Sequence, residues 1–386
     1  MKISRRADEL ALSVTLALDA RAKDLAASGV DVVNMSVGEP DFPAPSVVRA
    51  AAIAKVESGE VKYTPIPGTK ELRLTIARHL TETREIEFSA EEVLVSHSAK
   101  HALMNALLAL ADPGDEVLIP LPAWASYIEI VRLANGVAVE VAPTTSGGLD
   151  FDKLEAAVTP KTRGMIVNSP CNPSGYVMDR SETEALAEFA ARHDLWIVSD
   201  EIYRRLVYAG ERAFSPSEIS ADARSRTIII DGASKALAMT GYRIGYMAAP
   251  AAITKAAIKI QSQMTGAPNS ISQAAFQAGL ETEPVEVEAM VREFGERRNF
   301  LLSEFARLGL ETPNPRGAFY AFPNIARYTD SRGSSGFCEE LLEQEALALV
   351  PGIAFGMDEH VRMSYALSKP QLSEAIRRLE SFLQSR

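Results

Sequence analysis

A lysine and an arginine follow a buried-type strand in one stretch of this sequence. The stretch T-I-I-I-D-G-A-S-K-A-L-A-M-T-G-Y-R-I-G-Y (227–246) places Lys235 in a small loop and Arg243 between two glycines. A lysine amine can condense with an aldehyde, and an arginine beside glycines can hold a small anion because the backbone can approach it closely. A single lysine is usually a solvated surface residue, so this pair alone does not identify a site.

Other strand ends and helix starts in the sequence also carry polar residues. They are Ser98, Ala99 and Lys100 after V-L-V-S-H, Asn172 after M-I-V-N, and Asp200 and Tyr203 after L-W-I-V-S. Small residues that open a helix expose N–H groups suited to phosphate. Taken one at a time, an N-cap, a turn or a helix-capping acid explains each position.

Together these residues supply what pyridoxal phosphate (PLP) requires of a protein. The amine of Lys235 can form a Schiff base with the cofactor aldehyde, and the carboxylate of Asp200 can keep the pyridine nitrogen protonated. A phenol and an amide, Tyr203 and Asn172, can hydrogen-bond the 3′-oxygen of the ring. The arginine and the helix N-terminus can neutralise the phosphate.

The elements that must position these residues are short apolar runs that alternate with helical patterns. Strands are predicted at 93–96, 116–120, 137–141, 165–168, 195–199 and 227–231. Apolar residues at helical spacing, as in 99–110 and 181–193, separate several of them. The pattern predicts an α/β fold with a mainly parallel sheet flanked by helices, and with ligands beyond the carboxyl ends of the strands.

The pattern changes after about Pro284. An amphipathic stretch at 286–309 predicts a helix that could bridge two domains, and the remainder mixes short strands with two helices. The first forty or so residues contain one helix and a Gly/Pro-rich segment that we expect to pack with the C-terminal part. The predicted division is a large cofactor-binding domain at 46–283 and a smaller α+β domain formed by 1–45 and 284–386.

Composition excludes several classes of partner. The net charge is −11 over 386 residues, whereas wrapping nucleic acid requires a basic surface. Two cysteines, Cys171 and Cys338, form no disulfide framework and suggest a reducing compartment. No apolar run is long enough to span a bilayer, and the start lacks the apolar region of a signal peptide. We therefore expect a cytoplasmic protein without nucleic-acid or membrane partners.

The sequence resembles the fold type I, class I aminotransferases, the aspartate aminotransferase family, over essentially its whole length. The motifs that carry the resemblance are Y-T-P-I-P-G, N-P-S-G, D-E-I-Y, S-K-x-x-x-M-T-G-x-R-x-G and a C-terminal R-x-S. The resemblance implies a large domain with a seven-stranded-type sheet, and it makes Lys235 the Schiff-base lysine and proton carrier. It also implies that Asp200 pairs with the pyridinium and that Tyr203 and Asn172 contact the 3′-oxygen.

The same resemblance implies the remaining contacts with the cofactor and the substrate. It places around the phosphate Ser98, Ala99, Lys100 and Arg243. Some relatives carry a phosphate-binding serine at the position of Gly232, and here we expect Ser98 or Ser234 to supply that hydroxyl instead. Trp124 matches the aromatic residue that stacks on the ring, and Gly38 lines the same pocket. Arg362 matches the arginine that grips the substrate α-carboxylate as a fork. Tyr63 matches a tyrosine that reaches the phosphate of the neighbouring subunit, which implies a homodimer with shared active sites.

Specificity for the substrate side chain depends on one further cation. The stretch 264–272 has no arginine of the kind with which enteric-type members bind a second carboxylate. Lys100 matches a lysine of a bacterial subgroup, where it could pair with the distal acid of a dicarboxylate or only add positive field near the phosphate. Aspartate with 2-oxoglutarate, in ping-pong kinetics, is the favoured reaction. Glutamate– or aspartate–prephenate, aromatic, alanine and kynurenine aminotransferase activities are the alternatives.

Rival functions have weaker support in the sequence. His97 and His101 stand at the i,i+4 spacing of a zinc pair, but no third ligand is evident, so we expect a structural role and no metal. No G-x-G-x-x-G opens a helix after a strand, as a nicotinamide oxidoreductase would need. A regulatory protein would need an added DNA-binding module. A PLP carbon–sulfur lyase is the closest enzymatic competitor, and product analysis distinguishes it from an aminotransferase.

Overall fold

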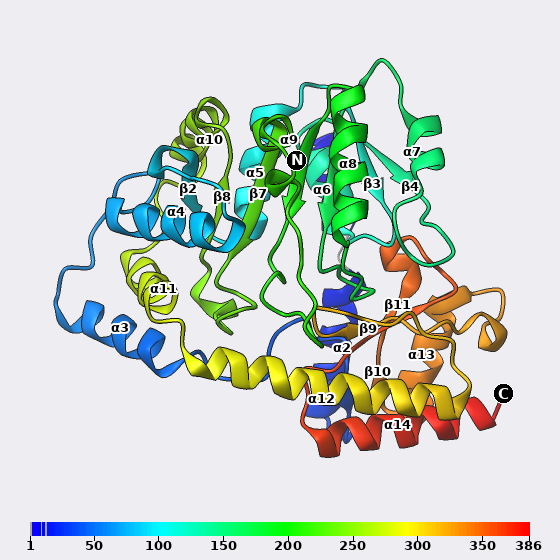
Figure 1. Ribbon diagram of the computed structural model, residues 1–386. Coiled ribbons are helices and arrows are strands. Elements are labelled where there is room, and N and C mark those ends of the chain that lie inside the picture. The colour runs from blue at the N-terminus through cyan, green and yellow to red at the C-terminus, as the bar shows by residue number, and fades with distance from the viewer. Residues whose placement is uncertain (1, 9, 12–13) are drawn as a thin grey trace.

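The described chain is built around one large mixed sheet, as the computed structural model in Figure 1 shows. The structure describes residues 2–8, 10–11 and 14–386. Its strands are β1 (Val33–Asn34), β2 (Val93–Ser96), β3 (Glu116–Pro120), β4 (Val137–Val141), β5 (Thr162–Asn168), β6 (Trp196–Asp200), β7 (Thr227–Gly232), β8 (Gly245–Ala248), β9 (Tyr320–Ala321), β10 (Leu347–Ala348), β11 (Val350–Pro351) and β12 (Val361–Ser364). Its α-helices are α1 (Arg5–Asp8), α2 (Val14–Ala27), α3 (Ser46–Glu57), α4 (Lys70–Arg84), α5 (Ala99–Leu110), α6 (Ser126–Leu133), α7 (Phe151–Ala157), α8 (Arg180–Arg192), α9 (Ala221–Arg226), α10 (Ala251–Met264), α11 (Ser270–Thr282), α12 (Val285–Leu308), α13 (Gly333–Glu345) and α14 (Lys369–Gln384).

Seven of the described strands form the central sheet, in the order β2-β8-β7-β6-β5-β3-β4. From β7 to β4 all neighbouring strands are parallel, whereas β8 pairs antiparallel with both β2 and β7. The predicted mainly parallel sheet is therefore confirmed. The sequence prediction missed β8, which has four residues and follows the turn at Arg243 directly.

Helices cover both faces of the sheet, because successive strand side chains point to opposite sides. Ile228 and Ile230 of β7 pack in one apolar cluster with side chains of α5, α6 and α10. Ile229 between them packs in another cluster, with side chains of α4 and α11. Helix α8 covers β5 and β6 on that second face. Burial on both faces explains why these strands appear in the sequence as unbroken apolar runs.

The long helix α12 extends beneath the sheet region towards the C-terminal elements (Figure 1). It begins after Pro284 and ends at Gly309, where φ is +65°, so the helix predicted at 286–309 is confirmed. Its apolar stripe includes Phe294 and Phe305, which pack in a core shared with α13, α14, β9 and β12. Met35, from the N-terminal segment, belongs to the same core, and β1 pairs with β10.

Within the described residues, no helix is long and apolar enough to cross a membrane. Both cysteines are buried and carry free thiols.

Candidate active site

The carboxyl ends of the parallel strands open onto a cavity of about 410 Å³. Its wall includes every predicted site residue except Tyr63, namely Gly38, Ser98, Ala99, Lys100, Trp124, Asn172, Asp200, Tyr203, Ser234, Lys235, Arg243 and Arg362. These residues come from segments up to 324 positions apart in the chain, from 38 to 362. The expectation that ligands bind beyond the strand ends thus corresponds to a real cavity in this structure.

Lys235 points from the loop after β7 towards the N-terminal segment. Its Nζ donates a 2.5 Å hydrogen bond to the carbonyl oxygen of Gly38. A larger residue at position 38 would be crowded, because its Cβ would lie 3.0 Å from the hydroxyl of Tyr320. The pKa of Lys235 is lowered to about 8, mainly by burial and in addition by the positive charges of Arg362 and Arg243, against the opposing effect of Glu39. The amine is therefore far more easily deprotonated than an ordinary lysine.

Asp200 ends β6 and is almost completely buried. The hydroxyl of Tyr127 donates a 2.7 Å hydrogen bond to its Oδ2, and the backbone N–H of Ile202 donates one of 3.2 Å to Oδ1. Burial raises the pKa of Asp200 to about 6, while these two hydrogen bonds act in the opposite direction. Tyr127 also packs its ring edge-on against Trp124, with 5.5 Å between ring centroids. The carboxylate is thus held in one orientation at the floor of the cavity.

Tyr203 reaches the cavity from the turn after β6 and meets a second phenol. Its hydroxyl lies 2.9 Å from that of Tyr320, which belongs to β9. Burial raises the pKa of Tyr203 well above its ordinary value, so the hydroxyl stays protonated and can donate. The sequence prediction had missed Tyr320.

Arg362 in β12 is a buried cation without a carboxylate partner among the described residues. Its Nη1 donates to Oδ1 of Asn172 at 3.0 Å, and its Nη2 donates to the carbonyl oxygen of Ser36 at 2.6 Å. The guanidinium lies over the ring of Tyr320, 4.5 Å from the centroid. Its Nε is buried without a hydrogen-bond partner. Because a buried charge is costly unless it is paired, this arrangement is suited to receiving an anion such as a carboxylate.

The start of α5 forms a narrow cradle on the opposite wall. Ser98, the N-cap of α5, has φ +125° and ψ 165°, a region that non-glycine residues rarely adopt. Gly245 lies directly beneath this turn, because a Cβ at Gly245 would come within 2.3 Å of the backbone nitrogen of Ala99. Ser98, Ala99 and Lys100 all line the cavity, so the N-terminal end of α5, where N–H groups lack intrahelical partners, borders it as a phosphate site requires.

Two cations stand beside this cradle. Arg243 has a left-handed backbone, and its Nη1 donates to the carbonyl oxygen of Thr240 at 2.8 Å. The Nζ of Lys100 lies 4.5 Å above the ring of Trp124. Burial, with the charge of Arg243, lowers the pKa of Lys100. Neither cation forms an ion pair within the described residues, so both remain able to bind an anionic ligand.

The absence of a serine at position 232 has a steric reason here. A Cβ at Gly232 would lie 2.7 Å from the Cα of Gly245, on the adjacent strand β8. Ser98 and Ser234 both line the cavity and are buried, so either hydroxyl is available in its place.

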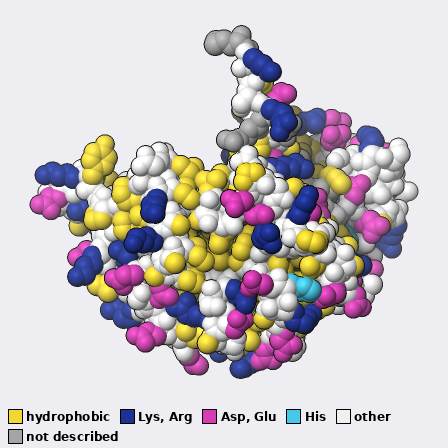
Figure 2. Space-filling model, turned by 90° about the horizontal axis from the view of Figure 1, so that it is seen from above, with side chains coloured by type: hydrophobic (Ala, Val, Ile, Leu, Met, Phe, Trp, Pro, Cys, Tyr) yellow, Lys and Arg dark blue, Asp and Glu magenta, His cyan; other side chains and the backbone are white. Residues whose placement is uncertain are grey.

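Tyr63 does not enter the cavity of its own chain. Its side chain is fully exposed, with a relative accessibility of 105%. Exposed apolar side chains also occur nearby in sequence, at Ile53, Val56 and Val61. On the face shown in Figure 2, hydrophobic side chains gather towards the middle, with charged side chains among them and around the edge. A tyrosine ring that lies wholly in water is unusual.

The histidine pair lies outside the cavity wall. The rings of His97 and His101 are 5.3 Å apart between centroids, and Nδ1 of His101 accepts a 3.3 Å hydrogen bond from the backbone N–H of His97. Burial, together with His97, lowers the pKa of His101 to about 4. No group of three or more metal-ligating side chains occurs within the part of the chain that the structure describes.

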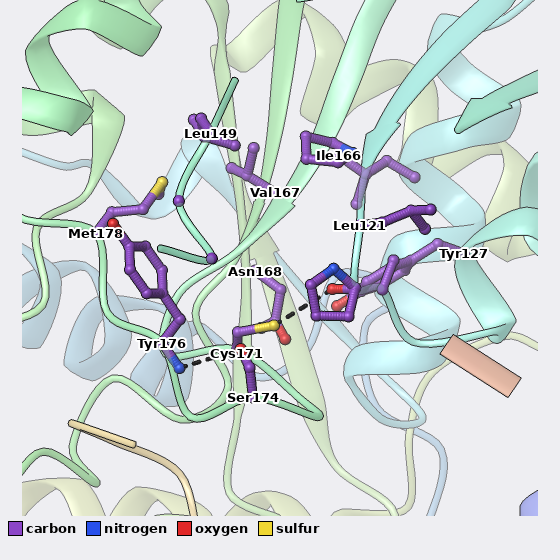
Figure 3. Close-up of a pocket in the computed structure, with 15 residues that line it drawn as sticks. Leu121, Tyr127, Leu149, Ile166, Val167, Asn168, Cys171, Ser174, Tyr176 and Met178 are labelled. Carbon is purple, nitrogen blue, oxygen red and sulfur yellow. Dashed lines mark hydrogen bonds between the residues drawn. The ribbon is translucent and has the colours of Figure 1, made fainter. Parts of the chain in front are cut away.

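A second, much smaller cavity of about 50 Å³ adjoins the floor of the first (Figure 3). Tyr127 and Asn168 line both cavities, and Cys171 closes the small one with its thiol directed at the carbonyl oxygen of Pro122. Its walls are otherwise largely apolar, as Figure 3 shows for Leu121 and Met178.

Comparison with known proteins agrees with this geometry. The family model described as aminotransferase class I and II matches residues 30–379. The chain belongs to this aminotransferase family. It is 40% identical over the full length of both chains to an aspartate aminotransferase of Geobacillus stearothermophilus. It is 39% identical to a probable aspartate/prephenate aminotransferase of Thermus aquaticus, covering 99% of each chain.

Solved structures give the same answer for the fold. The aspartate aminotransferase from Thermus thermophilus with maleate superposes with a TM-score of 0.95 at 39% identity, covering 99% of this chain and 100% of the other. The aspartate aminotransferase of Rhizobium meliloti superposes with a TM-score of 0.94 at 36% identity, covering 100% and 99%. The predicted aminotransferase family and the predicted fold type are confirmed.

Proposed function

We propose that the protein is a PLP-dependent aminotransferase that moves an amino group between L-aspartate and 2-oxoglutarate. The observation that carries this proposal is that Lys235 and Arg362 line the same cavity. The first is an amine of lowered pKa, and the second is a buried guanidinium with no carboxylate partner among the described residues. Amino acids and oxo acids share the α-carboxylate that such a guanidinium would bind.

The residues of the cavity fit PLP group by group. Lys235 would hold it covalently, Asp200 would face the pyridine nitrogen, and Tyr203 with Asn172 would face the 3′-oxygen. The phosphate would be held by Ser98, Ala99, Lys100, Ser234 and Arg243, and the ring by Trp124. When bound, PLP supplies an electron sink for the charge left on Cα as its proton departs. A carboxylate with a pKa of about 6 in a buried site gains most from a cationic neighbour, and a pyridinium provides one.

The chain's own residues would orient the substrate and move its proton. Arg362 would hold the α-carboxylate as a two-pronged fork, beside Asn172 and Gly38, so that the Cα proton points at Lys235. Lys235 must be neutral to accept that proton, and its lowered pKa makes the neutral form accessible near physiological pH. The same amine would return the proton on the cofactor side. Donor and acceptor would use this site in turn, which gives ping-pong kinetics.

Lys100 would determine the preference for a dicarboxylate. It is a partly desolvated cation without an ion-pair partner among the described residues, and it lies above Trp124 on the cavity wall. The names of the similar proteins support aspartate, and one solved relative carries maleate, itself a dicarboxylate. Prephenate is the second candidate, because relatives from Thermus aquaticus and Nitrosomonas europaea are named aspartate/prephenate aminotransferases.

We also propose a cytoplasmic homodimer in which Tyr63 of one subunit contacts the phosphate bound by the other. The fully exposed ring of Tyr63 supports this assignment. The proposed division into a large domain at 46–283 and a small one at 1–45 plus 284–386 is supported by the core that joins Met35 to α12, α13 and α14. That core also takes in Leu206 and Tyr208 from the larger part, so the two parts are packed together.

Two experiments test the proposal. A screen of amino donors against 2-oxoglutarate should show glutamate formation with aspartate as the preferred donor. Release of pyruvate or sulfide without an acceptor would instead indicate a lyase. Borohydride reduction followed by peptide mapping should leave the pyridoxyl mass on Lys235, and a label elsewhere, or none, would refute the covalent attachment.

A further inference from the structure

The segment 64–69 forms neither helix nor strand, yet the side chains of two buried glutamines hold it, Gln273 at both ends and Gln261 between them. It follows Tyr63 and reads T-P-I-P-G-T. Gln261 of α10 donates from Nε2 to the carbonyl oxygen of Ile66 at 3.0 Å. Gln273 of α11 accepts at Oε1 from the backbone N–H of Thr69 and donates from Nε2 to Oγ1 of Thr64, both at 2.8 Å.

The amide of Gln261 is completely buried and makes four hydrogen bonds. Besides Ile66, its Nε2 donates to the carbonyl oxygen of Val95 at 2.9 Å. Its Oε1 accepts from Oγ of Ser96 at 2.6 Å and from Nδ2 of Asn105 at 2.9 Å. An amide whose two N–H groups and two lone pairs are all used in a dry interior has a single allowed orientation.

This network lies between two functional segments. Ser96 ends β2, two residues before Ser98, the N-cap of the phosphate cradle, and Asn105 belongs to α5. On the other side, Ile66 is three residues beyond the exposed Tyr63. Gln261 therefore connects the cradle of its own chain to the segment that carries Tyr63 outward.

We propose that Gln261 is a positioning residue that acts across the dimer, by holding the segment 64–69 so that Tyr63 is presented to the phosphate in the partner subunit. This inference depends on the proposed function, because it assumes both the cofactor and the dimer. Gln273 supports the same segment from α11 and has the same role. A tyrosine at the end of an unsupported loop would have to be ordered at the moment of binding, which weakens the contact.

The direct test uses hybrid dimers with one labelled site. One subunit carries Lys235→Ala, so that borohydride can attach PLP only to the intact subunit. In the trans hybrid, Gln261→Met is placed in the Lys235→Ala subunit, and in the cis hybrid it is placed in the intact subunit. Samples are withdrawn at intervals during dialysis and only then reduced with borohydride. The pyridoxyl label on Lys235, measured by mass spectrometry, gives the PLP still bound at each time, so release is followed without any turnover. Gln384→Met, at an exposed position of α14, is the matched control.

We expect PLP to leave the intact site about ten-fold faster in the trans hybrid than in the control hybrid. A trans hybrid that retains PLP as the control does, or a loss confined to the cis hybrid, would overturn the inference. In the second case Gln261 would act only on its own cradle. If Gln261→Met does not fold, Thr64→Val removes only the hydroxyl that accepts from Gln273, and it should accelerate trans release about three-fold with an unchanged melting temperature. An unaltered release rate for this variant would likewise count against the proposal.

The proposed function fails by different results. A wild-type protein that is monomeric, or whose Lys235 takes no label, would overturn the dimer or the cofactor assignment, and this inference with it. A labelled dimer with no trans effect would overturn the inference alone.

Discussion

The hydroxyl of Tyr127 donates a 2.7 Å hydrogen bond to the carboxylate of Asp200, and this contact favours the ionised form of Asp200. Burial raises the pKa of Asp200 to about 6, and the hydrogen bond from Tyr127 is the largest opposing effect. The ring of Tyr127 also packs against Trp124. A residue that the sequence prediction had passed over thus links the carboxylate proposed to face the cofactor nitrogen to the ring proposed to stack on the cofactor.

Tyr127→Phe should therefore impair the enzyme mainly at low pH. Loss of the hydrogen bond raises the pKa of Asp200 further, so the acidic limb of kcat/KM should move to higher pH. At pH 7 we expect kcat/KM to fall about ten-fold, the scale of one hydrogen bond to a charged group. Tyr176→Phe, which removes a hydrogen bond to Glu182 outside the large cavity, is the control. An unshifted acidic limb would contradict the assigned role.

Arg362→Lys should impair both half-reactions alike. A lysine cannot bridge Asn172 and the carbonyl oxygen of Ser36 while it offers two parallel donors to a carboxylate. We expect kcat/KM to fall by about 100-fold or more for aspartate and for 2-oxoglutarate, with PLP affinity little changed. Steady-state kinetics for each substrate, together with a PLP titration, measure this. A loss limited to one of the two substrates would mean that Arg362 does not bind the group they share.

Lys100→Met should separate dicarboxylic from monocarboxylic donors. Methionine keeps much of the length and apolar contact of the side chain over Trp124 but removes the charge. With aspartate kcat/KM should fall by about 10- to 100-fold, and with alanine by less than about three-fold. Lys23→Met is the comparison, because Lys23 also lines the cavity but is exposed and paired with Asp19. Equal losses with both donors would assign Lys100 to the phosphate alone.

Lys235→Met should stabilise the cofactor-free protein in a pH-dependent way. The pKa of Lys235 is about 8 in the folded chain and 10.5 ordinarily, so the folded state binds fewer protons between these values. The wild-type free energy of unfolding therefore rises with pH from about 8 to about 10.5 relative to the variant. The gain from Lys235→Met should be on the order of 1–3 kcal/mol below pH 8 and should vanish as the pH approaches 10.5.

Urea unfolding of both proteins at several pH values checks this. A gain that does not change between pH 7 and 10 would show that the lysine carries no buried charge. Gln384→Met, exposed on α14, should leave the free energy of unfolding within about 0.5 kcal/mol of the wild-type value at every pH.

The chemistry of the site could be predicted from the sequence because the strand ends carry it locally. Lys235, Asp200 and Asn172 each stand within a few residues of a strand that the apolar runs had marked. Parallel strands bring their carboxyl ends to one edge, so residues distant in sequence were expected to converge. Their motifs, taken together, indicated the family, which the comparisons then confirmed.

Only the tertiary structure determined the partners of these groups. Tyr320 meets Tyr203 because β9 pairs with β12 in a core that the central strands do not predict. Tyr127 reaches Asp200, at the end of β6, from helix α6. Strand β8 exists because β2 and β7 supply hydrogen-bonding edges on both its sides, although its four residues carry too little pattern to predict it. Local sequence determines which chemical groups are present, whereas distances, burial and pKa shifts arise from contacts between segments that no local pattern encodes.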